Sequence, residues 1–270
     1  MSVQLKRTPA FIEPKLSRPP SSRATTLPSD TELKATPGTD STNTGPLSTT
    51  LPEPLSLPWP LKPFSSARSG LKTLADGRRC FWVDEFLEGV TPKMLVWWFS
   101  HLEGEVEIGG RLLSRYRVFH PLDHCWVRYV RRSPDGSIGP GAQIRICEFI
   151  DRNPRYKTDV TATIEKLDET GFINNVVVAG LSIVRMEHDF HQTGGGTRFE
   201  HRLITPGNMK LWLLSKPVSA LMFPNAKGHA WLKHAVEEMG TLENFLPQLY
   251  GQEVEGKREP VLQRKIGETR

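Results

Sequence analysis

The sequence lacks any hydrophobic run long enough to cross a membrane. A spanning helix needs about 18 or more apolar residues, and the longest candidate in these 270 residues is the interrupted stretch from Val176 to Val184. Mean hydropathy is −0.39, and 37% of the residues are hydrophobic, which suits one sizeable buried core. We therefore exclude a transmembrane protein and expect one folded domain.

Cysteine is also scarce. The three residues Cys80, Cys125 and Cys147 show no C-x-x-C spacing, and an odd count fits buried free thiols better than a disulfide scaffold. The opening MSVQLKRTPAFIEP has no apolar core of the kind found in secretory signals. The sequence therefore favours a reducing compartment, and the expected location is cytoplasmic.

A concentrated excess of one charge is missing as well. Thirty-five Lys and Arg residues face 30 Asp and Glu residues, so the net charge is +5. The basic residues are spread along the chain rather than massed in a stripe with interleaved aromatic residues. We expect no nucleic-acid partner and no membrane partner.

Proline is abundant, but only near the start of the chain. Twelve of the 22 prolines fall within the first 63 residues, in a Ser/Thr/Pro-rich text with scattered leucines. Such a segment buries too little apolar surface to offset its ordering entropy, and its acidic residues argue against a mitochondrial presequence. We predict a disordered, dispensable tail over 1–70, a folded domain over 71–250 and a charged C-terminal tail over 251–270.

Hydrophobic spacing predicts two helices. Thr91 and Pro92 supply an N-cap and a first-turn proline ahead of KMLVWWFSHLEG, whose apolar residues recur at helical spacing. A second helical stripe marks Ala230 to Leu246.

Between these helices the apolar period is two, which predicts consecutive antiparallel strands. The segments are RYRVFH, HCWVRYVR, AQIRICEF, DVTATIEKL, NNVVVAGLSIVRMEHDF and GTRFEHRLI. The glycine run before the last segment reads as a hairpin turn. A curved antiparallel sheet with one long late helix is the α+β helix-grip arrangement, which encloses a cavity.

Several ionisable residues fall on faces that should be buried. His234 and Glu238 are spaced i, i+4 and lie on the apolar stripe of the late helix. Strict alternation places Glu148 on the same face as two isoleucines of its strand, where a carboxylate needs a partner. Three histidines also fall at inward positions or at the start of a strand: His124, His188 and His201.

Two imidazoles and two carboxylates converging on a dry cavity suit a divalent transition metal, above all zinc. The favoured ligand set is His124, Glu148, His234 and Glu238. Taken singly, each residue has another explanation, because an inward histidine is often a hydrogen-bonded core residue and an i, i+4 pair often lies on the surface. Asp123 is predicted either to hold the ring of the adjacent His124 or to form a turn after Pro121.

The segments MLVWWF, RYRVFHPLDH and HAVEEM running into LENFLPQLY, with an isolated strand glutamate between them, carry a resemblance. From about Phe81 to Tyr250 the chain resembles the diacetylphloroglucinol hydrolase family, which includes phloretin hydrolases. The resemblance implies a helix-grip fold of the Bet v 1/START type and a zinc ion held by two His and two Glu. The matching positions are the four residues already favoured as ligands.

The resemblance also implies a reaction. Family members cleave the carbon–carbon bond between a phenolic ring and its acyl group, so the expected partner is a small aromatic ketone. Tyr116 matches a family tyrosine and is expected to donate a hydrogen bond or a proton, with His188 and then His201 as further catalytic candidates. The Ser/Thr/Pro-rich tail does not match the family's helical extension.

Alternatives remain open at this point. A non-hydrolytic hydrophobic-ligand binding protein, or a polyketide-tailoring cyclase or isomerase, would preserve the same fold signals. A homodimer is compatible with the sequence.

Overall fold

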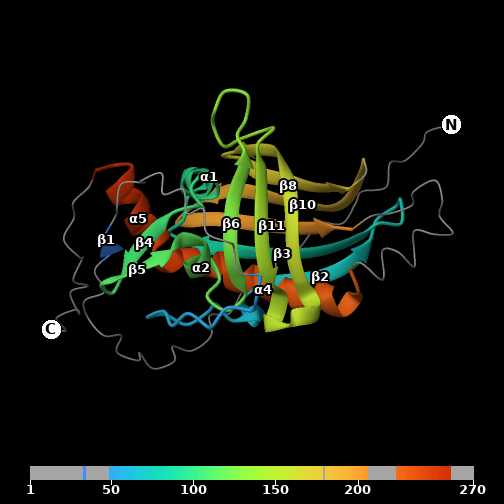
Figure 1. Cartoon of the computed structure of the whole chain (residues 1–270), viewed down its shortest axis with the longest axis horizontal. Coiled ribbons are helices and arrows are strands. Elements are labelled where there is room, and N and C mark those ends of the chain that lie inside the picture. Colours follow the sequence, from blue (N-terminus) through green and yellow to red (C-terminus); the bar gives the residue numbers. More distant parts are fainter. Residues whose placement is uncertain (1–32, 35–48, 179, 206–222, 257–270) are drawn as a thin grey trace, which may run out of the picture.

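An eight-stranded antiparallel sheet curves around a long helix near the C-terminus (Figure 1). The structure is a computed structural model that describes residues 33–34, 49–178, 180–205 and 223–256. The strand order is β2-β3-β11-β10-β9-β8-β7-β6. The strands are β2 (Arg68–Thr73), β3 (Arg79–Glu88), β6 (His124–Arg131), β7 (Gln143–Phe149), β8 (Lys157–Asp168), β9 (Gly171–Val178), β10 (Leu181–Thr193) and β11 (Gly196–Ile204).

A second, three-stranded sheet lies at one end of the molecule in the order β1-β4-β5 (Figure 1). Its strands are β1 (Leu33–Lys34), β4 (Glu105–Ile108) and β5 (Arg111–Ser114). The helices are α1 (Pro92–Ser100), α2 (Arg115–Phe119), α4 (Asn225–Thr241) and α5 (Leu246–Glu253). Short 3-10 turns are η1 (Phe64–Ser66), η2 (Ile150–Arg152), η3 (Pro154–Tyr156) and η4 (Leu242–Asn244).

The structure confirms the α+β helix-grip prediction. The long helix α4 crosses the strands of the large sheet (Figure 1) and packs most extensively on β3. Residues that alternate along each strand put one apolar face against α1, α2 and α4, as a period of two requires. A cavity remains between the sheet and α4, in agreement with the sequence-based expectation.

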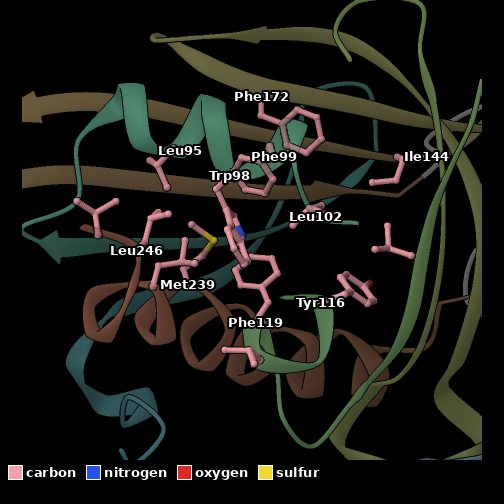
Figure 2. Close-up of a cluster of buried hydrophobic side chains, with 14 of the residues drawn as sticks. Leu95, Trp98, Phe99, Leu102, Tyr116, Phe119, Ile144, Phe172, Met239 and Leu246 are labelled. Carbon is pink, nitrogen blue, oxygen red and sulfur yellow. The ribbon is translucent and has the colours of Figure 1, made fainter. Parts of the chain in front are cut away.

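Helix α1 contributes Phe99 to the lining of this cavity and packs Trp98 into the core beside it. Thr91 caps it by accepting a hydrogen bond from the backbone N–H of Met94 at 3.3 Å, and Pro92 occupies the first turn, as predicted. Figure 2 shows Trp98 reaching down toward Phe119 of α2, and their rings meet edge to face at 5.4 Å. The apolar spacing of MLVWWF therefore builds a wall of the core.

The predicted strand RYRVFH is wrong, because these residues form the short helix α2. The Ser114 side chain accepts a hydrogen bond from the backbone N–H of Arg117 and starts the turn. Six residues are too few to separate a period of two from a period of 3.6. The helix matters for the site because it turns Tyr116 into the cavity lining.

The segment NNVVVAGLSIVRMEHDF is likewise two strands, β9 and β10, rather than one. Gly180 has a φ of 78°, a left-handed conformation that favours glycine and reverses the chain. The hairpin turn predicted at the glycine run is confirmed between β10 and β11.

The predicted boundary at residue 70 is also wrong. Residues 49–70 lie on the domain, where Trp59 stacks on Phe245 with centroids 5.9 Å apart and the Leu55 N–H donates to the Pro121 carbonyl. Gly240 leaves room for the Lys62 side chain, since a Cβ there would lie 2.3 Å from it. Composition could not reveal these contacts, because they depend on a surface formed elsewhere in the chain. The rest of the predicted tail, apart from β1, lies outside the described residues.

The late helix and the C-terminal tail also differ from their predicted bounds. Helix α4 begins earlier than Ala230 and ends at Thr241, and the predicted tail over 251–270 begins inside α5. Glu253 accepts a hydrogen bond from the buried guanidinium of Arg115, which anchors the end of α5 to the domain. Residues 257–270 lie outside the described residues.

The three cysteines are free, with Cys80 and Cys147 buried and Cys125 half-buried. Among the described residues, no helix combines the length and the apolarity that crossing a membrane requires.

Candidate metal centre and cavity

The cavity between the sheet and α4 has a volume of about 330 Å³. Hydrophobic side chains such as Phe99, Phe172 and Met239 form most of its lining. Lys157, Thr158, Asp159 and Lys227 line part of the cavity. Seven further polar side chains form two groups, one between α2, β7 and α4 and one on the inner face of β9, β10 and β11. They are Tyr116, Glu148, His234 and Glu238 in the first group, and Asn174, His188 and His201 in the second.

The structure brings the four predicted ligands together. His124 opens β6 and lies directly across from Glu148 on β7, as their strand register shows. His234 and Glu238 project from successive turns of α4. The Nε2 atom of His124 is 3.5 Å from Glu148 Oε1 and 3.5 Å from Glu238 Oε1, while His234 Nε2 is 3.9 Å from Glu238 Oε2. These atoms come from three elements that are distant in sequence.

The donor set fits a zinc ion. Ligands at about 2.1 Å from a tetrahedral ion lie about 3.4 Å from one another, close to the observed separations. His124 is fully buried, and its Nε2 has no hydrogen-bond partner within the described part of the chain. A buried ring nitrogen without a partner is costly unless it meets a ligand. One atom each from His124, Glu148 and His234 also falls within a mutual distance of 4.8 Å.

The other ring nitrogen of each histidine is held by a fixed partner. His124 Nδ1 lies 2.8 Å from the carbonyl oxygen of Tyr116, and His234 Nδ1 lies 2.8 Å from Asp123 Oδ2. A carbonyl only accepts, so Nδ1 of His124 carries the proton and Nε2 keeps a lone pair toward the two glutamates. This is the arrangement that orients metal-binding histidines.

Asp123 therefore holds a different ring from the one expected. It was predicted to contact His124, its sequence neighbour, but it contacts His234 instead, 111 residues away. It also accepts hydrogen bonds from the backbone N–H groups of Asp151 at 2.8 Å and Arg152 at 3.0 Å. Both of those residues have a positive φ, so Asp123 stabilises an unusual turn as well. Asp123 does lie in the turn after Pro121, as one alternative predicted, but its side chain holds the ring of His234 rather than that of His124.

Three carboxyl groups, those of Asp123, Glu148 and Glu238, surround these ring nitrogens. Burial raises the pKa of Glu238 to about 8, with His234 opposing the shift and Glu148 adding to it. Burial alone would lower the pKa of His234, but the hydrogen bond and charge of Asp123 raise it to about 9. Burial holds the pKa of His124 well below its usual range. Glu238 and His234 thus both hold a proton at neutral pH, and a metal ion bound here would displace these protons.

Tyr116 contacts two of the candidate ligands. Its hydroxyl donates a hydrogen bond to Glu148 Oε1, and its ring stacks on His124 at 3.9 Å with an angle of 11°. Burial and the Glu148 carboxylate both raise the pKa of this phenol. Tyr116 therefore remains a protonated hydrogen-bond donor at neutral pH.

His188 and His201 lie together on the sheet. They form a directly opposed pair in the register of β10 and β11, and their rings meet edge to face at 4.6 Å. Both are buried among phenylalanine rings, including Phe199. Burial lowers the pKa of His188 to about 3 and that of His201 well below its usual range, so both are neutral imidazoles.

Two buried polar residues, Asn174 and Glu85, were not singled out by the sequence analysis. Asn174 lines the cavity and its Oδ1 has no partner among the described residues, while Glu85 lies on the inner face of β3. The alternation Phe81, Val83, Glu85 would have revealed the latter by the argument used for Glu148. His120 stacks on the His234 ring at 4.3 Å, a contact between distant segments that no sequence pattern signals.

Comparisons with known proteins reach the fold only. No protein-family model matches the chain, and no curated protein matches it. The protein Ms6760 from Mycobacterium smegmatis is 14% identical with a TM-score of 0.43, and the match covers 69% of this chain and 98% of that chain. A START superfamily protein from the same organism is 13% identical with a TM-score of 0.36, and the match covers 58% of this chain and 98% of that chain.

The structure of Ara h 8.0201 is 15% identical with a TM-score of 0.33, and that match covers 59% of this chain and 98% of that chain. At TM-scores below 0.5 these likenesses carry no argument about activity. The function therefore has to be inferred from the residues of the cavity.

Proposed function

We propose that this protein is a zinc-dependent hydrolase that cleaves the carbon–carbon bond between a phenolic ring and its acyl group. The observation that carries the proposal is the convergence of His124, Glu148, His234 and Glu238 at the edge of a mostly apolar cavity. Three buried carboxyl groups, those of Asp123, Glu148 and Glu238, surround the two imidazoles. Burying such groups costs free energy unless a cation is bound, and a simple carrier of apolar ligands does not need them.

The cavity suits a substituted aromatic ring. Its volume of about 330 Å³ is at the small end of the range for ligand sites. The parallel rings of Phe99 and Phe172, whose centroids are 4.6 Å apart, form part of an apolar wall. Neutral His188 and His201, with ring nitrogens that lack partners in the described chain, can meet the hydroxyl groups of a phenol. The predicted metal ligands would thus face the acyl group of an acylphenol, and His188 and His201 would face its ring hydroxyls.

The reaction follows from the groups on each side. A bound zinc ion would supply a Lewis acid for the acyl carbonyl and lower the pKa of water. Water adds to the acyl carbon, the bond to the ring breaks, and its electron pair goes to the ring. The products are a carboxylic acid and a ring that carries hydrogen in place of the acyl group. A polyhydroxylated ring is a good leaving group because its negative charge is delocalised onto oxygen.

The protein's own residues have separate tasks in this scheme. Tyr116 holds Glu148 and presents a hydroxyl proton at the cavity wall. His188 and His201 accept hydrogen bonds from the ring hydroxyls, because an imidazole with a depressed pKa stays neutral and keeps a ring nitrogen free to accept. The hydrophobic lining limits the entry of bulk water, which strengthens these interactions.

The experiment is an assay for acid release combined with metal analysis. Purified protein is incubated with a panel of acylphloroglucinols, and the carboxylic acid and free ring are quantified by chromatography. We expect about one zinc per chain by elemental analysis and equimolar acid and ring products, with both lost after chelation and restored by zinc. Full activity in protein stripped of metal would overturn the proposal.

A second candidate function is a ligand-binding protein or a cyclase or isomerase on the same fold. The observation in its favour is the largely hydrophobic cavity itself, which would hold an aromatic ligand without reaction. The same incubation distinguishes the candidates. A binding protein changes ligand fluorescence and leaves the ketone intact, a cyclase or isomerase gives a product of unchanged mass, and the hydrolase gives two fragments.

A further inference from the structure

Glu85 is a buried carboxyl group with no task in the scheme above. It lies on the inner face of β3 and is 3% exposed. Neither of its carboxyl oxygens has a hydrogen-bond partner within the part of the chain that the structure describes. Two charged or ionisable groups lie close to it: Lys62 Nζ is 3.7 Å from Oε2, and His201 Nε2 is 4.0 Å from Oε1. A buried carboxyl in this position calls for an explanation.

Lys62 does not by itself explain Glu85. The Lys62 ammonium already lies 2.6 Å from Glu243 Oε1 and donates a hydrogen bond of 2.6 Å to the Phe86 carbonyl. Its charge is therefore balanced by a closer and more exposed carboxylate. A second carboxylate, placed deeper and farther away, adds desolvation cost for little further attraction.

His201 is the better partner. Strand β11 pairs with β3 so that His201 lies opposite Val83 and Phe199 lies opposite Glu85. His201 is 1% exposed, it lines the cavity, and neither of its ring nitrogens has a hydrogen-bond partner among the described residues. A side-chain rotation that moves Oε1 by about 1 Å would bring the pair to hydrogen-bond distance.

We propose that Glu85 is a positioning residue for His201: a carboxyl oxygen of Glu85 accepts the Nε2–H of the imidazole and leaves Nδ1 as an acceptor for a phenolic hydroxyl of the ligand. This inference rests on the proposed function, in which His201 handles a ring hydroxyl. The imidazole stays neutral throughout, and its fixed Nδ1 lone pair orients the phenolic hydroxyl of the ligand by accepting its hydrogen bond.

The electrostatics are compatible with this role. Burial raises the pKa of Glu85 to about 8, and the Lys62 ammonium opposes the shift. The carboxyl is therefore mainly protonated at neutral pH and ionised at pH 9, and its carbonyl oxygen can accept the Nε2–H in either state. Carboxylate partners of this kind fix the tautomer and orientation of a histidine.

The test measures the His201 tautomer directly, so it does not depend on turnover. Protein with ¹⁵N-labelled histidine is studied by NMR at pH 9, where the Glu85 carboxyl is ionised, and the His201 signals are assigned with His201→Gln. We expect a hydrogen-bonded Nε2–H proton on His201 in the wild type. It should disappear in Glu85→Leu and persist in Glu85→Gln, whose amide oxygen still accepts.

Glu243→Gln is the matched control, because this carboxylate binds Lys62 without touching His201, and it should leave the resonance unchanged. In the acid-release assay, Glu85→Leu should lower kcat about ten-fold or more with little change in KM or zinc content, and Glu85→Gln should recover part of the loss. If Glu85→Leu does not fold, the kcat values decide the question, because Glu85→Gln should lower kcat and Glu243→Gln should leave it unchanged.

An absent Nε2–H resonance in the wild type, or one that persists in Glu85→Leu, would overturn the positioning role. Equal losses in Glu85→Gln and Glu243→Gln would overturn it too, since they would assign Glu85 to Lys62. Failure of every protein to release acid would instead overturn the proposed function and leave the NMR result to decide the positioning role.

Discussion

Two groups of buried histidines lie in or beside the wall of one cavity, and they differ in what surrounds them. In the α4 group, His124 and His234 each have one ring nitrogen held by an oxygen, and three carboxylates lie nearby. In the sheet group, His188 and His201 pack among phenylalanine rings. Neither ring nitrogen of His201 has a hydrogen-bond partner within the described chain. Burial is nearly complete in both.

The difference indicates two kinds of chemistry. The imidazoles of His124 and His234, oriented by fixed partners and surrounded by three carboxyl groups, suit a bound cation. Neutral imidazoles in an apolar wall suit a neutral ligand that brings its own hydroxyl groups. One cavity therefore presents a metal-binding side and a ring-binding side, and each prediction below changes one side while leaving the other in place.

The largest effect is expected from Glu238→Gln on the metal-binding side. The change removes a charged candidate ligand that lies 3.5 Å from His124 Nε2, so zinc affinity should fall about 100-fold or more, beyond the loss typical of outer partners. Competition with a chromophoric chelator measures it. Glu237→Gln, one residue earlier on α4, is the matched control and should bind zinc normally. Equal zinc affinity in both variants would remove Glu238 from the ligand set.

A smaller loss is expected from Asp123→Asn. Asp123 accepts a hydrogen bond from the His234 ring rather than facing the metal position, so we expect zinc affinity to fall roughly ten-fold. The same chelator competition applies. The thermal midpoint of the chelated variant shows separately what the turn at Asp151 and Arg152 loses. Unchanged zinc affinity with a lowered midpoint would reduce Asp123 to its turn-forming role.

Truncation of the N-terminal segment should lower the stability of the domain and leave the metal-binding side in place. Removing residues 1–64 deletes Trp59 and Lys62, and loss of a partly buried tryptophan costs about 2 kcal/mol. The melting temperature should then drop by roughly 5 °C, while zinc affinity stays the same. Removing only residues 1–48 is the control and should change little. Equal melting temperatures for the two truncations would mean that residues 49–64 contribute no stability.

The two groups should also respond to pH in opposite directions after zinc is removed. The pKa of His234 is raised to about 9, so its contribution is present below pH 6.5 and is lost as pH rises through 9. The pKa of His188 is lowered to about 3, so its contribution is present above pH 6.5 and is lost as pH falls toward 3.

Urea midpoints across this range can separate the two contributions. His234→Gln should flatten the alkaline limb of the stability profile, and His188→Gln should flatten the acid limb. Each slope is at most about 1.4 kcal/mol per pH unit for one proton. If both variants flattened the same limb, the contrast between the two groups would be wrong.

Much of the site could be predicted from the periodicity of single strands and helices, which shows which side chains point toward the core. Strand alternation placed Glu148 inward, and helical spacing placed His234 and Glu238 on one stripe, because these periods follow from backbone geometry alone. The same rule would have identified Glu85. It was less useful for RYRVFH, where a short window fits both periods and the structure forms a helix.

Contacts between distant segments could not be predicted in this way. The pairing of Asp123 with His234, the stacking of His120 on His234 and the docking of Trp59 on Phe245 each join residues that no local pattern connects. The N-terminal segment is the clearest case, since its composition resembles disorder and its order comes from the surface it covers.

The sequence by itself determined the α+β class, the antiparallel strands, the late helix and the inward direction of the ionisable residues, because local periodicity specifies which side chains share a face. Only the tertiary structure decided which of them meet. His124, Glu148, His234 and Glu238 come within 4 Å of one another in pairs because strand register and the path of α4 bring three elements together. Those positions depend on packing across the whole domain, to which every element contributes and which no single segment encodes.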